Sequence, residues 1–326
     1  MYAIQVSEFG THDVLTYTTL PTPEPGAGQV RVRMHAVGVN PADAYIRSGT
    51  YAFFTPQLPY TPGFDGAGVV DEVGRGVDTV RPGDRVFVGA LGTRGCSGTY
   101  AELAVVDAAA IHPLPPTVSF SHGAAVGIPC VTAWRALFQK ANVQPGETVL
   151  IHGASGGVGI PATQLARDAA AVAIGTAGSP RAADLVRAAG ARYVLDHTSP
   201  GYLDELARIT DGLGVDVIIE MLADVNLKRD LEVLAKGGRI VVVGSRGSLN
   251  FTPRLTMLKE ATILGTALWN ASEFETAEAL AAVTQKLRDG VIHPVIADEF
   301  PLRDAPAAHR KLFEPGTRGK LILIAE

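Results

Sequence analysis

The pattern of hydrophobic and polar positions changes near residue 121. Before that point, polar and apolar residues alternate over short stretches such as residues 29–34, as they do in strands with one buried face. Further apolar runs at residues 66–73 and 84–88 are separated by glycine and proline, with a turn sequence at residues 81–84. Short strands joined by turns predict a mainly β, barrel-like first domain.

After residue 121, continuous apolar runs alternate with helical stretches. Uninterrupted runs of valine, isoleucine and leucine are typical of parallel strands that are buried on both faces. The helices carry end signals, as where Ser179 caps a helix that begins at Pro180 and ends before Gly190. This alternation predicts an α/β domain with a doubly wound, parallel, six-stranded Rossmann sheet. The six expected strands are residues 148–152, 172–176, 193–195, 215–220, 239–243 and 262–268.

A C-terminal segment follows the expected sheet. A helix over residues 273–289 and a closing strand over residues 320–324 make up this segment, and we expect it to return to the first domain. The expected domains are residues 1–123 together with 269–326, and a nucleotide-binding domain at residues 124–268. Other helices are expected at residues 131–140, 158–170, 202–210 and 227–234.

Composition narrows the possible functions. The 326 residues are 47% hydrophobic and 19% charged, which suits two packed domains and argues against disorder. The formal net charge of −5 offers no basic surface for nucleic acid or anionic lipid. We expect no secretion signal, because residues 1–8 lack a basic segment followed by an apolar run. We expect no membrane span, because no apolar stretch approaches about 20 residues. Two cysteines cannot build a disulfide framework, so we expect a cytoplasmic protein.

The most specific motif follows the first strand of the expected sheet. Ala154, Gly156 and Gly159 have the spacing G/A-x-G-x-x-G directly after a strand and at the start of a helix. A side chain at position 156 would keep the backbone away from a pyrophosphate, and Gly159 lets the helix pack closely on the strand. The free N–H groups and the dipole of the first helical turn favour phosphate groups. The motif therefore predicts a dinucleotide site.

The segment after the second strand favours NADPH over NADH. NAD enzymes place an Asp or Glu roughly 20 residues after the glycines, where it binds the ribose 2′-hydroxyl. Residues 175–181 contain no acid, and they contain Arg181, which suits a 2′-phosphate. Arg181 could equally be a solvated residue of the first helical turn, so the missing acid is the stronger observation. Residues 243–246 and 266–268 also end strands and are expected at the nicotinamide half.

The sequence lacks the ligands of a zinc site. Many dehydrogenases with this combination of domains hold zinc through Cys and His or Glu side chains. Asn40 stands where such enzymes have a cysteine, residues 62–66 lack a Gly-His-Glu sequence, and residues 89–98 contain one cysteine, not four. Cys130 is expected in the core. We therefore predict no metal, so that a hydrogen-bond donor must polarise the substrate oxygen.

Five segments resemble the zeta-crystallin-like NADPH:quinone oxidoreductases, a zinc-free branch of the medium-chain dehydrogenase/reductase superfamily. The resemblance covers nearly the whole chain and implies a GroES-like catalytic domain built from both termini, with NADPH in the cleft beside a central Rossmann domain. The five segments are residues 37–51, 58–63, 152–159, 220–227 and 243–247. The implied cofactor contacts are Tyr45, Ser155, Gly156, Gly157, Val158, Gly178, His197, Asn226, Val243, Gly244, Ser245, Arg246, Thr266, Ala267 and Leu268, with Asn40, Tyr51 and Thr132 at the nicotinamide end.

The resemblance implies reduction of a quinone, or of another electron-poor carbonyl acceptor. Tyr45 or Tyr51 could donate a hydrogen bond to the developing oxyanion, or both could be wall residues. Asn40 is a candidate catalytic residue or the end of a turn before Pro41. His197 is expected to bind on the adenosine side. Asp65 and Asp224 lie in matching segments, and the sequence suggests no role for them.

Two other functions stay open at this point. One is an enal or enone reductase on the same fold, which differs only in its acceptor. The other is a nucleotide-binding protein with a structural or RNA-binding role, although the acidic balance counts against RNA. We also expect a homodimer or homotetramer, in which residues 261–268 form an edge strand shared between subunits.

Overall fold

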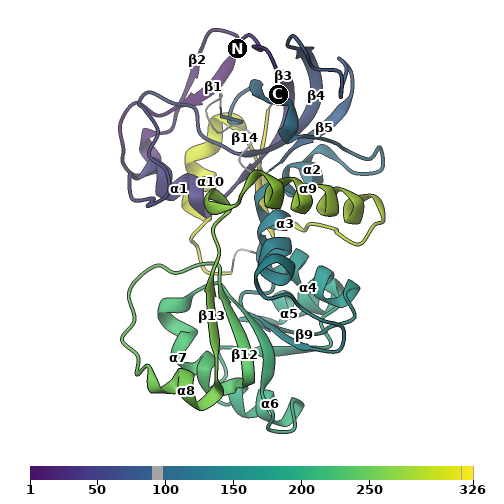
Figure 1. The fold of residues 1–326 in the computed structure, drawn as a ribbon. Helices are drawn as coiled ribbons and strands as arrows, with labels where there is room; N and C mark the ends of the chain where they lie inside the picture. Colours follow the sequence, from purple (N-terminus) through teal and green to yellow (C-terminus); the bar gives the residue numbers. More distant parts are fainter. Residues whose placement is uncertain (90–97, 317, 326) are drawn as a thin grey trace. The chain divides into compact units, whose positions relative to one another are not determined.

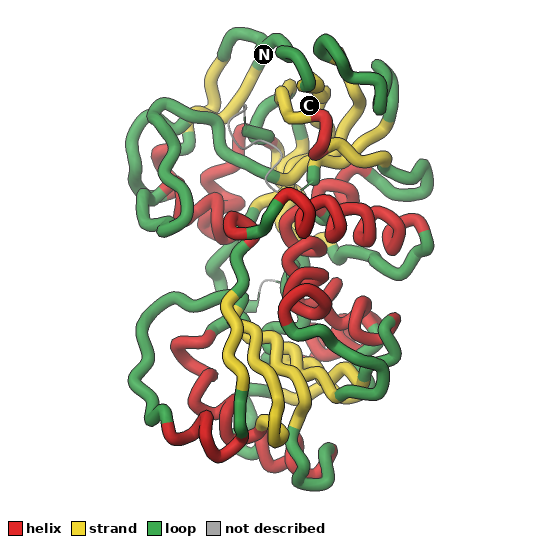
Figure 2. The backbone as a smooth tube through the Cα atoms, in the orientation of Figure 1, coloured by secondary structure: helices red, strands yellow, loops and turns green. Residues whose placement is uncertain are grey.

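The computed structural model describes residues 1–89, 98–316 and 318–325. The chain forms two compact units (Figures 1 and 2). Unit 1 consists of Met1–Val131, Leu280–Arg288 and Pro294–Glu326, and unit 2 of Thr132–Ala279 and Asp289–His293. The domain boundaries expected at 123/124 and 268/269 stay a prediction. Among the described residues, no helix combines the length and the apolar character that a bilayer crossing requires.

Unit 1 is built on a seven-stranded, mainly antiparallel sheet in the order β14-β15-β3-β4-β5-β7, with β6 paired to β3. The C-terminal strand β15 pairs with β3, so the end of the chain does return to the sheet of the N-terminal segment. Only β14 and β15 run parallel within this sheet, as far as the described residues show. The strands are β3 Gln29–Val39, β4 Asp65–Val73, β5 Arg85–Val88, β6 Leu103–Asp107, β7 Ile111–Pro113, β14 Ile296–Pro301 and β15 Lys320–Ile324.

The core of unit 1 follows from the alternation along β3. Residues 30, 32 and 34 are buried and their neighbours are not, whereas residues 36–39 are all buried because α2 (Phe120–Ala124) also contacts this strand. Valines and leucines from β3, β5 and β15 form one hydrophobic cluster. The other elements of unit 1 are β1 Tyr2–Gln5, η1 His12–Val14, β2 Thr16–Thr19, α1 Pro41–Arg47, η2 Ala108–Ala110, η5 Leu302–Asp304 and α10 Ala305–Lys311.

Unit 2 contains the predicted six-stranded sheet. All its neighbouring strands pair in parallel, in the order β10-β9-β8-β11-β12-β13. This is the Rossmann order, in which the first strand lies beside the fourth, so the prediction of a doubly wound parallel sheet is confirmed. The strands are β8 Thr148–Ile151, β9 Val172–Ala177, β10 Tyr193–Asp196, β11 Val215–Glu220, β12 Leu234–Val242 and β13 Thr262–Gly265.

The helices of unit 2 form two groups that contact the sheet. The helices α4 (Gly159–Asp168) and α5 (Pro180–Ala189) contact each other, and so do α6 (Tyr202–Ile209), α7 (Ala223–Val233) and α8 (Arg254–Lys259) in turn (Figure 1). The predicted ends of α5 are confirmed. The Ser179 hydroxyl accepts a hydrogen bond from Ala182 N at 3.3 Å, and Gly190 has a φ of 106°.

Some element ends differ from the expected ones. Instead of one helix over residues 131–140, α3 spans Gly127–Trp134 and continues as a π-helical turn, η3, over Arg135–Lys140. The strand β13 ends at Gly265, not at residue 268. Gly265 lies beside Val242, the last residue of β12, and Thr266 N donates to the carbonyl oxygen of Val242 at 3.0 Å before the chain turns away. Residues 268–270 form a 3-10 turn, η4, and α9 spans Glu273–Arg288.

Candidate nucleotide site and active-site residues

The glycine loop after β8 has the backbone geometry that a diphosphate requires. Gly153 has a φ of 57°, in the left-handed region that favours glycine. A Cβ atom on Gly159 would lie 2.3 Å from the carbonyl oxygen of Gly153, and one on Gly156 would lie 3.2 Å from the same oxygen. Glycine at these positions lets the loop close tightly before α4. In the first turn of α4, Ile160 N donates to the carbonyl oxygen of Gly156 at 3.1 Å and Pro161 has no N–H. A diphosphate would therefore meet the backbone of the loop and the positive end of the helix dipole.

Thr176, at the end of β9, holds the start of this loop. Its hydroxyl accepts a hydrogen bond from Gly153 N at 3.2 Å, and its carbonyl oxygen accepts one from Ala154 N at 3.1 Å. The loop lies between β8 and β11, where the strand order of the sheet reverses. Ligands of open α/β sheets bind at this switch point, outside the carboxyl ends of the strands.

A buried cluster of three ionisable side chains lies directly behind the loop. His152 Nε2 lies 2.9 Å from Asp230 Oδ1 and 3.5 Å from Glu220 Oε2. The other Glu220 oxygen accepts hydrogen bonds from Leu222 N and, at 3.2 Å, from the amide of Asn226. The cluster therefore connects the glycine loop to Asn226, a predicted cofactor contact on α7.

Burial controls the charge of this cluster. Desolvation raises the pKa of Glu220 to about 7, although the nearby His152 opposes the shift. Burial also acts to lower the pKa of His152, but the hydrogen bond to Asp230 and the two carboxylates outweigh it and leave the pKa raised. The three side chains have ligand atoms within 4.8 Å of one another, and they are the candidate metal-binding group among the described residues. His152 is thus paired with two carboxylates, while Glu220 Oε2 and Asp230 Oδ2 are buried without a hydrogen-bond partner within the described structure.

The loop after β12 is held against the end of β11. Val243 N donates to the carbonyl oxygen of Glu220 at 2.8 Å, and a Cβ on Gly244 would lie 2.5 Å from the carbonyl oxygen of Met221. Asp224 Oδ1 accepts hydrogen bonds from Ser245 Oγ at 3.2 Å and from Arg246 N at 2.8 Å. Asp224, for which the sequence suggested no role, thus orders two predicted cofactor contacts.

Three further predicted contacts, Gly178, His197 and Thr266, directly follow strands, whereas Arg181 and Thr132 lie on helices. Gly178 and His197 are adjacent, since a Cβ on Gly178 would lie 2.9 Å from His197 Nε2. Arg181 is exposed on the first turn of α5. The Thr266 hydroxyl is buried and has no hydrogen-bond partner within the described structure, as expected of a group that binds a ligand. Thr132 is half-buried on α3.

The two candidate tyrosines lie in unit 1. Tyr45 is half-buried on α1, with its ring centre 5.7 Å from that of Phe313. Tyr51 follows α1, and its ring centre lies 5.4 Å from that of Phe53. Both rings therefore pack against phenylalanines, as wall residues do, and a direct chemical role for either hydroxyl stays a prediction.

Asn40 belongs to a buried polar network in unit 1. It is 3% exposed, its amide donates to Asp65 Oδ2 at 2.9 Å, and its carbonyl oxygen accepts a hydrogen bond from Lys320. The Lys320 ammonium also lies 2.9 Å from Asp65 Oδ2, and Ile128 N donates to Asp65 Oδ1 at 2.6 Å. The Asn40 side chain thus has partners within unit 1, and its catalytic role stays a prediction.

A second carboxyl group extends this network. Asp43 Oδ2 accepts a hydrogen bond from Asn40 N at 2.8 Å and lies 3.1 Å from the Tyr100 hydroxyl. Burial raises the pKa of Asp43 to about 7, although the bond to Asn40 and the charge of Lys320 oppose the shift. Cys130 is buried, as expected of a core residue. Cys96 lies outside the described residues.

Several of the buried charged side chains in these two networks were not predicted from the sequence. Lys320 begins an otherwise apolar strand, and Glu220 ends another. A charged residue at the end of a buried strand is a usable signal, because an isolated buried charge is costly and must find a partner. Asp230 carries no such signal, since it lies on a helix in which half of the other residues are polar.

Two family models match the chain. An alcohol dehydrogenase GroES-like domain matches residues 26–116, and a zinc-binding dehydrogenase matches residues 157–283. Together with a Rossmann sheet and a strand-end nucleotide site, these matches define a medium-chain dehydrogenase/reductase.

Curated relatives identify the branch. The quinone oxidoreductases of Rattus norvegicus and Homo sapiens are 45% and 43% identical to this chain over 326 residues, covering 99% of this chain and 98% of each relative. The structure of Escherichia coli quinone oxidoreductase complexed with NADPH is 29% identical, with a TM-score of 0.88, over 99% of this chain and 100% of that one. An NAD-dependent alcohol dehydrogenase is 30% identical, with a TM-score of 0.91, over 100% of both chains. The chain therefore belongs to the zeta-crystallin-like quinone oxidoreductase family, and the resemblance is confirmed.

Proposed function

We propose that this chain is an NADPH-dependent quinone oxidoreductase that works without a metal. The observation that carries the proposal is the glycine loop of residues 153–159 at the switch point of the sheet, in a chain 45% identical to rat quinone oxidoreductase along its length. The NADPH complex of the Escherichia coli relative supports the choice of cofactor.

The residues of unit 2 fit a dinucleotide. The loop backbone and the dipole of α4 would hold the diphosphate, and the Thr266 hydroxyl, which is buried without a partner among the described residues, would gain one. Residues 175–181, which include Gly178 and Arg181, contain no carboxylate. A 2′-phosphate bound beside Gly178 and His197 would therefore meet no repulsion from this segment. When bound, the dinucleotide supplies reducing equivalents from C4 of its nicotinamide ring.

The protein's own contribution is positioning and hydrogen bonding. Holding the acceptor in a reactive orientation supplies most of the catalysis. A phenol from Tyr45 or Tyr51 would donate a hydrogen bond to the oxygen on which negative charge develops. Neither needs to act as a strong acid, because the reduced quinone is weakly basic. If Tyr45→Phe and Tyr51→Phe, singly and together, keep the full kcat, this donor role is wrong.

The buried network around Asn40 supports a metal-free site. Asn40 stands where zinc members of the superfamily have a cysteine, and it shares the ammonium of Lys320 with Asp65. A cation is thus already present, and a zinc ion would have to displace it against charge repulsion. Elemental analysis of purified active protein tests this point. Stoichiometric zinc would contradict it and would also direct attention to His152, Glu220 and Asp230.

An acceptor screen tests the function. Purified protein should oxidise NADPH with 1,4-benzoquinone and 1,2-naphthoquinone at least about tenfold more efficiently, in kcat/KM, than with a 2-alkenal. A tenfold ratio corresponds to a difference of about 1.4 kcal/mol in transition-state binding. Higher efficiency with the alkenal would favour the enal or enone reductase. Equal efficiency with NADH would refute the 2′-phosphate argument. Failure to oxidise NADPH, together with tight RNA binding, would favour the non-enzymatic alternative.

The edge of the parallel sheet supports a homodimer or a homotetramer. The strand β13 lies at this edge, with Ile263 38% exposed, and the adjacent α8 exposes Met257 and Leu258 by 73% and 68%. An unpaired edge beside apolar side chains is suited to pairing with a second subunit. Ile263→Lys should therefore yield monomers in analytical ultracentrifugation. A cytoplasmic location, supported by the low cysteine content, remains part of the proposal.

A further inference from the structure

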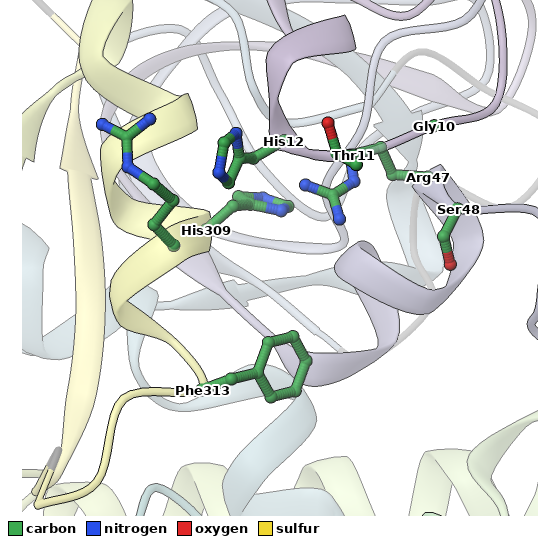
Figure 3. Close-up of a pocket in the computed structure, with 8 residues that line it drawn as sticks. Gly10, Thr11, His12, Arg47, Ser48, His309 and Phe313 are labelled. Carbon is green, nitrogen blue, oxygen red and sulfur yellow. The ribbon is translucent and has the colours of Figure 1, made fainter.

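Unit 1 contains a pocket that the proposed function does not use. It has a volume of about 550 Å³, within the usual range for small-molecule sites. Its walls come from η1, the end of α1 and the end of α10, and none of them is a predicted cofactor contact. They include Thr11, His12, Arg47, His309, Arg310 and Phe313 (Figure 3).

The central feature of the pocket is a buried guanidinium. Arg47 is 8% exposed, and its Nε and Nη1 atoms are buried with no hydrogen-bond partner in the part of the chain that the structure describes. Desolvation lowers the pKa of Arg47, but arginine stays protonated in proteins. A buried cation is normally paired with an anion, because an isolated one is costly. Arg47 therefore carries an unneutralised positive charge at the wall of the pocket.

The groups around Arg47 include a second cation. Figure 3 shows the Arg47 guanidinium near the imidazoles of His12 and His309, with the Phe313 ring set apart from them at another wall of the pocket. Arg310, at the exposed side, contributes a second guanidinium. The carboxylate that faces these groups is Asp13, whose side chain is 74% exposed and is bonded to Thr11 and His12. Two guanidiniums thus face one solvated carboxylate.

His309 is a neutral wall residue of the pocket. Its Nδ1 atom is buried without a partner in the described structure, and its Nε2 atom lies 3.0 Å from the Tyr100 hydroxyl. That hydroxyl donates to Asp43 Oδ2 at 3.1 Å, so it accepts from Nε2, and the imidazole proton resides on Nε2. Burial lowers the pKa of His309 to about 3, with help from Arg47 and His12, so the ring adds no positive charge and the anion would depend on the guanidiniums of Arg47 and Arg310.

We propose that this pocket binds a phosphate or carboxylate group of a small organic molecule. The anion would pair with Arg47 and Arg310, whose planar guanidiniums match two oxygens of either group. The Phe313 ring, 39% exposed, would contact the apolar part of the ligand. Ser48, which also lines the pocket, offers a hydroxyl. The ligand is therefore an amphipathic anion, and neither a bare ion nor a neutral quinone meets the whole site.

Calorimetric titration of the full-length protein with phenyl phosphate tests the proposal. Titrations with inorganic phosphate, benzoate and phenol separate the contributions of the anion and the ring. Each is repeated with saturating NADP⁺, so that phosphate binding at the glycine loop is blocked. We expect phenyl phosphate or benzoate to bind one site that NADP⁺ does not abolish, and phenol to bind at least about tenfold more weakly, since a charge-assisted hydrogen bond accounts for that ratio. Phenol binding as tight as that of both anions would overturn the proposal.

Matched variants locate the site. Arg310→Gln changes an exposed rim residue and should weaken the anion several-fold, whereas Arg303→Gln, at an exposed position outside the pocket, should leave binding unchanged. Arg47→Met should lose binding by about tenfold or more. Its folding is checked by circular dichroism, and Arg310→Gln tests the site even if that variant does not fold. Equal affinity in the wild type, Arg310→Gln and Arg303→Gln would refute the assignment.

Discussion

Replacing Lys320 by methionine removes a buried positive charge and keeps most of the apolar length of the side chain. The Lys320 side chain is 5% exposed, and its ammonium lies 2.9 Å from Oδ2 of Asp65, whose side chain is 0% exposed. The variant leaves the Asp65 carboxylate buried without its cation. We therefore expect Lys320→Met to lower the free energy of unfolding of unit 1.

The size of this loss follows from the contacts that remain. Removing one partner of a buried ion pair costs about 3–5 kcal/mol, because the other charge is left uncompensated. Asp65 keeps two donors in the variant, the N–H of Ile128 at 2.6 Å and the amide of Asn40 at 2.9 Å. These donors stabilise part of the charge on Asp65, so we expect a loss at the lower end of this range, about 3 kcal/mol. At roughly 2–4 °C per kcal/mol, the melting midpoint should fall by about 6–12 °C.

Scanning calorimetry on a double-mutant cycle measures the coupling between the two charges. Asp65→Asn also removes the buried negative charge, so the double variant should be less destabilised than the sum of the two single variants, by about 2 kcal/mol. Lys311→Met is the matched control. It breaks a Lys–Asp contact of 2.7 Å to Asp298, but the side chains are 37% and 44% exposed, and exposed pairs contribute only about 0–1 kcal/mol. A midpoint change no larger than that of Lys311→Met, or strict additivity in the cycle, would refute the reasoning.

Three further predictions concern unit 2. Because burial raises the pKa of Glu220 from 4.5 to about 7, the folded protein holds a proton that the unfolded chain releases, and stability should fall by on the order of 3 kcal/mol as the pH rises through this window. Urea unfolding at pH 5 and pH 8 should show a smaller pH dependence in Glu220→Gln, and an unchanged one would contradict the shift. Gly159→Ala should lower the melting midpoint and weaken NADPH binding, because its Cβ would overlap the backbone of residues 153 and 154, whereas Gly201→Ala, with nothing closer than 3.9 Å, should do neither. Asp224→Ala should raise the KM for NADPH several-fold at unchanged kcat and melting midpoint, since it releases Ser245 and Arg246 from their hydrogen bonds; a lowered kcat with unchanged KM would argue against this role.

The Rossmann sheet and its glycine loop could be predicted because their signals are local. Uninterrupted valine and isoleucine runs encode strands that are buried on both faces, and Ser179 and Gly190 mark the two ends of one helix. The spacing of Gly156 and Gly159 encodes a close approach of backbone to backbone, and the position of Gly159 against Gly153 shows why a side chain is excluded there. Each of these properties depends on residues a few positions apart.

The ends of some elements could not be predicted locally. The strand β13 ends beside the last residue of β12, Val242, which pairs with Gly265. These two strands are separated along the chain by a connection of the kind found in a βαβ unit, so the end of β13 depends on a distant segment. The capping box of Asn40 and Asp43 marks the start of α1, but the same asparagine also satisfies a turn before proline. Pairing with neighbouring strands and packing against other elements decide between such alternatives.

Periodicity, glycine spacing and composition by themselves determined a β-rich segment, a six-stranded nucleotide-binding sheet and the position of the diphosphate loop. Only the tertiary structure decided which buried charges are paired: Lys320 with Asp65, 255 positions away, and His152 with Asp230, 78 positions away. The same is true of Arg47, whose buried Nε and Nη1 atoms have no hydrogen-bond partner among the described residues. The physical reason is that the energy of a charge depends on its distance to other charges and on its exposure to water. Both quantities are set by the packing of segments that are far apart in the chain.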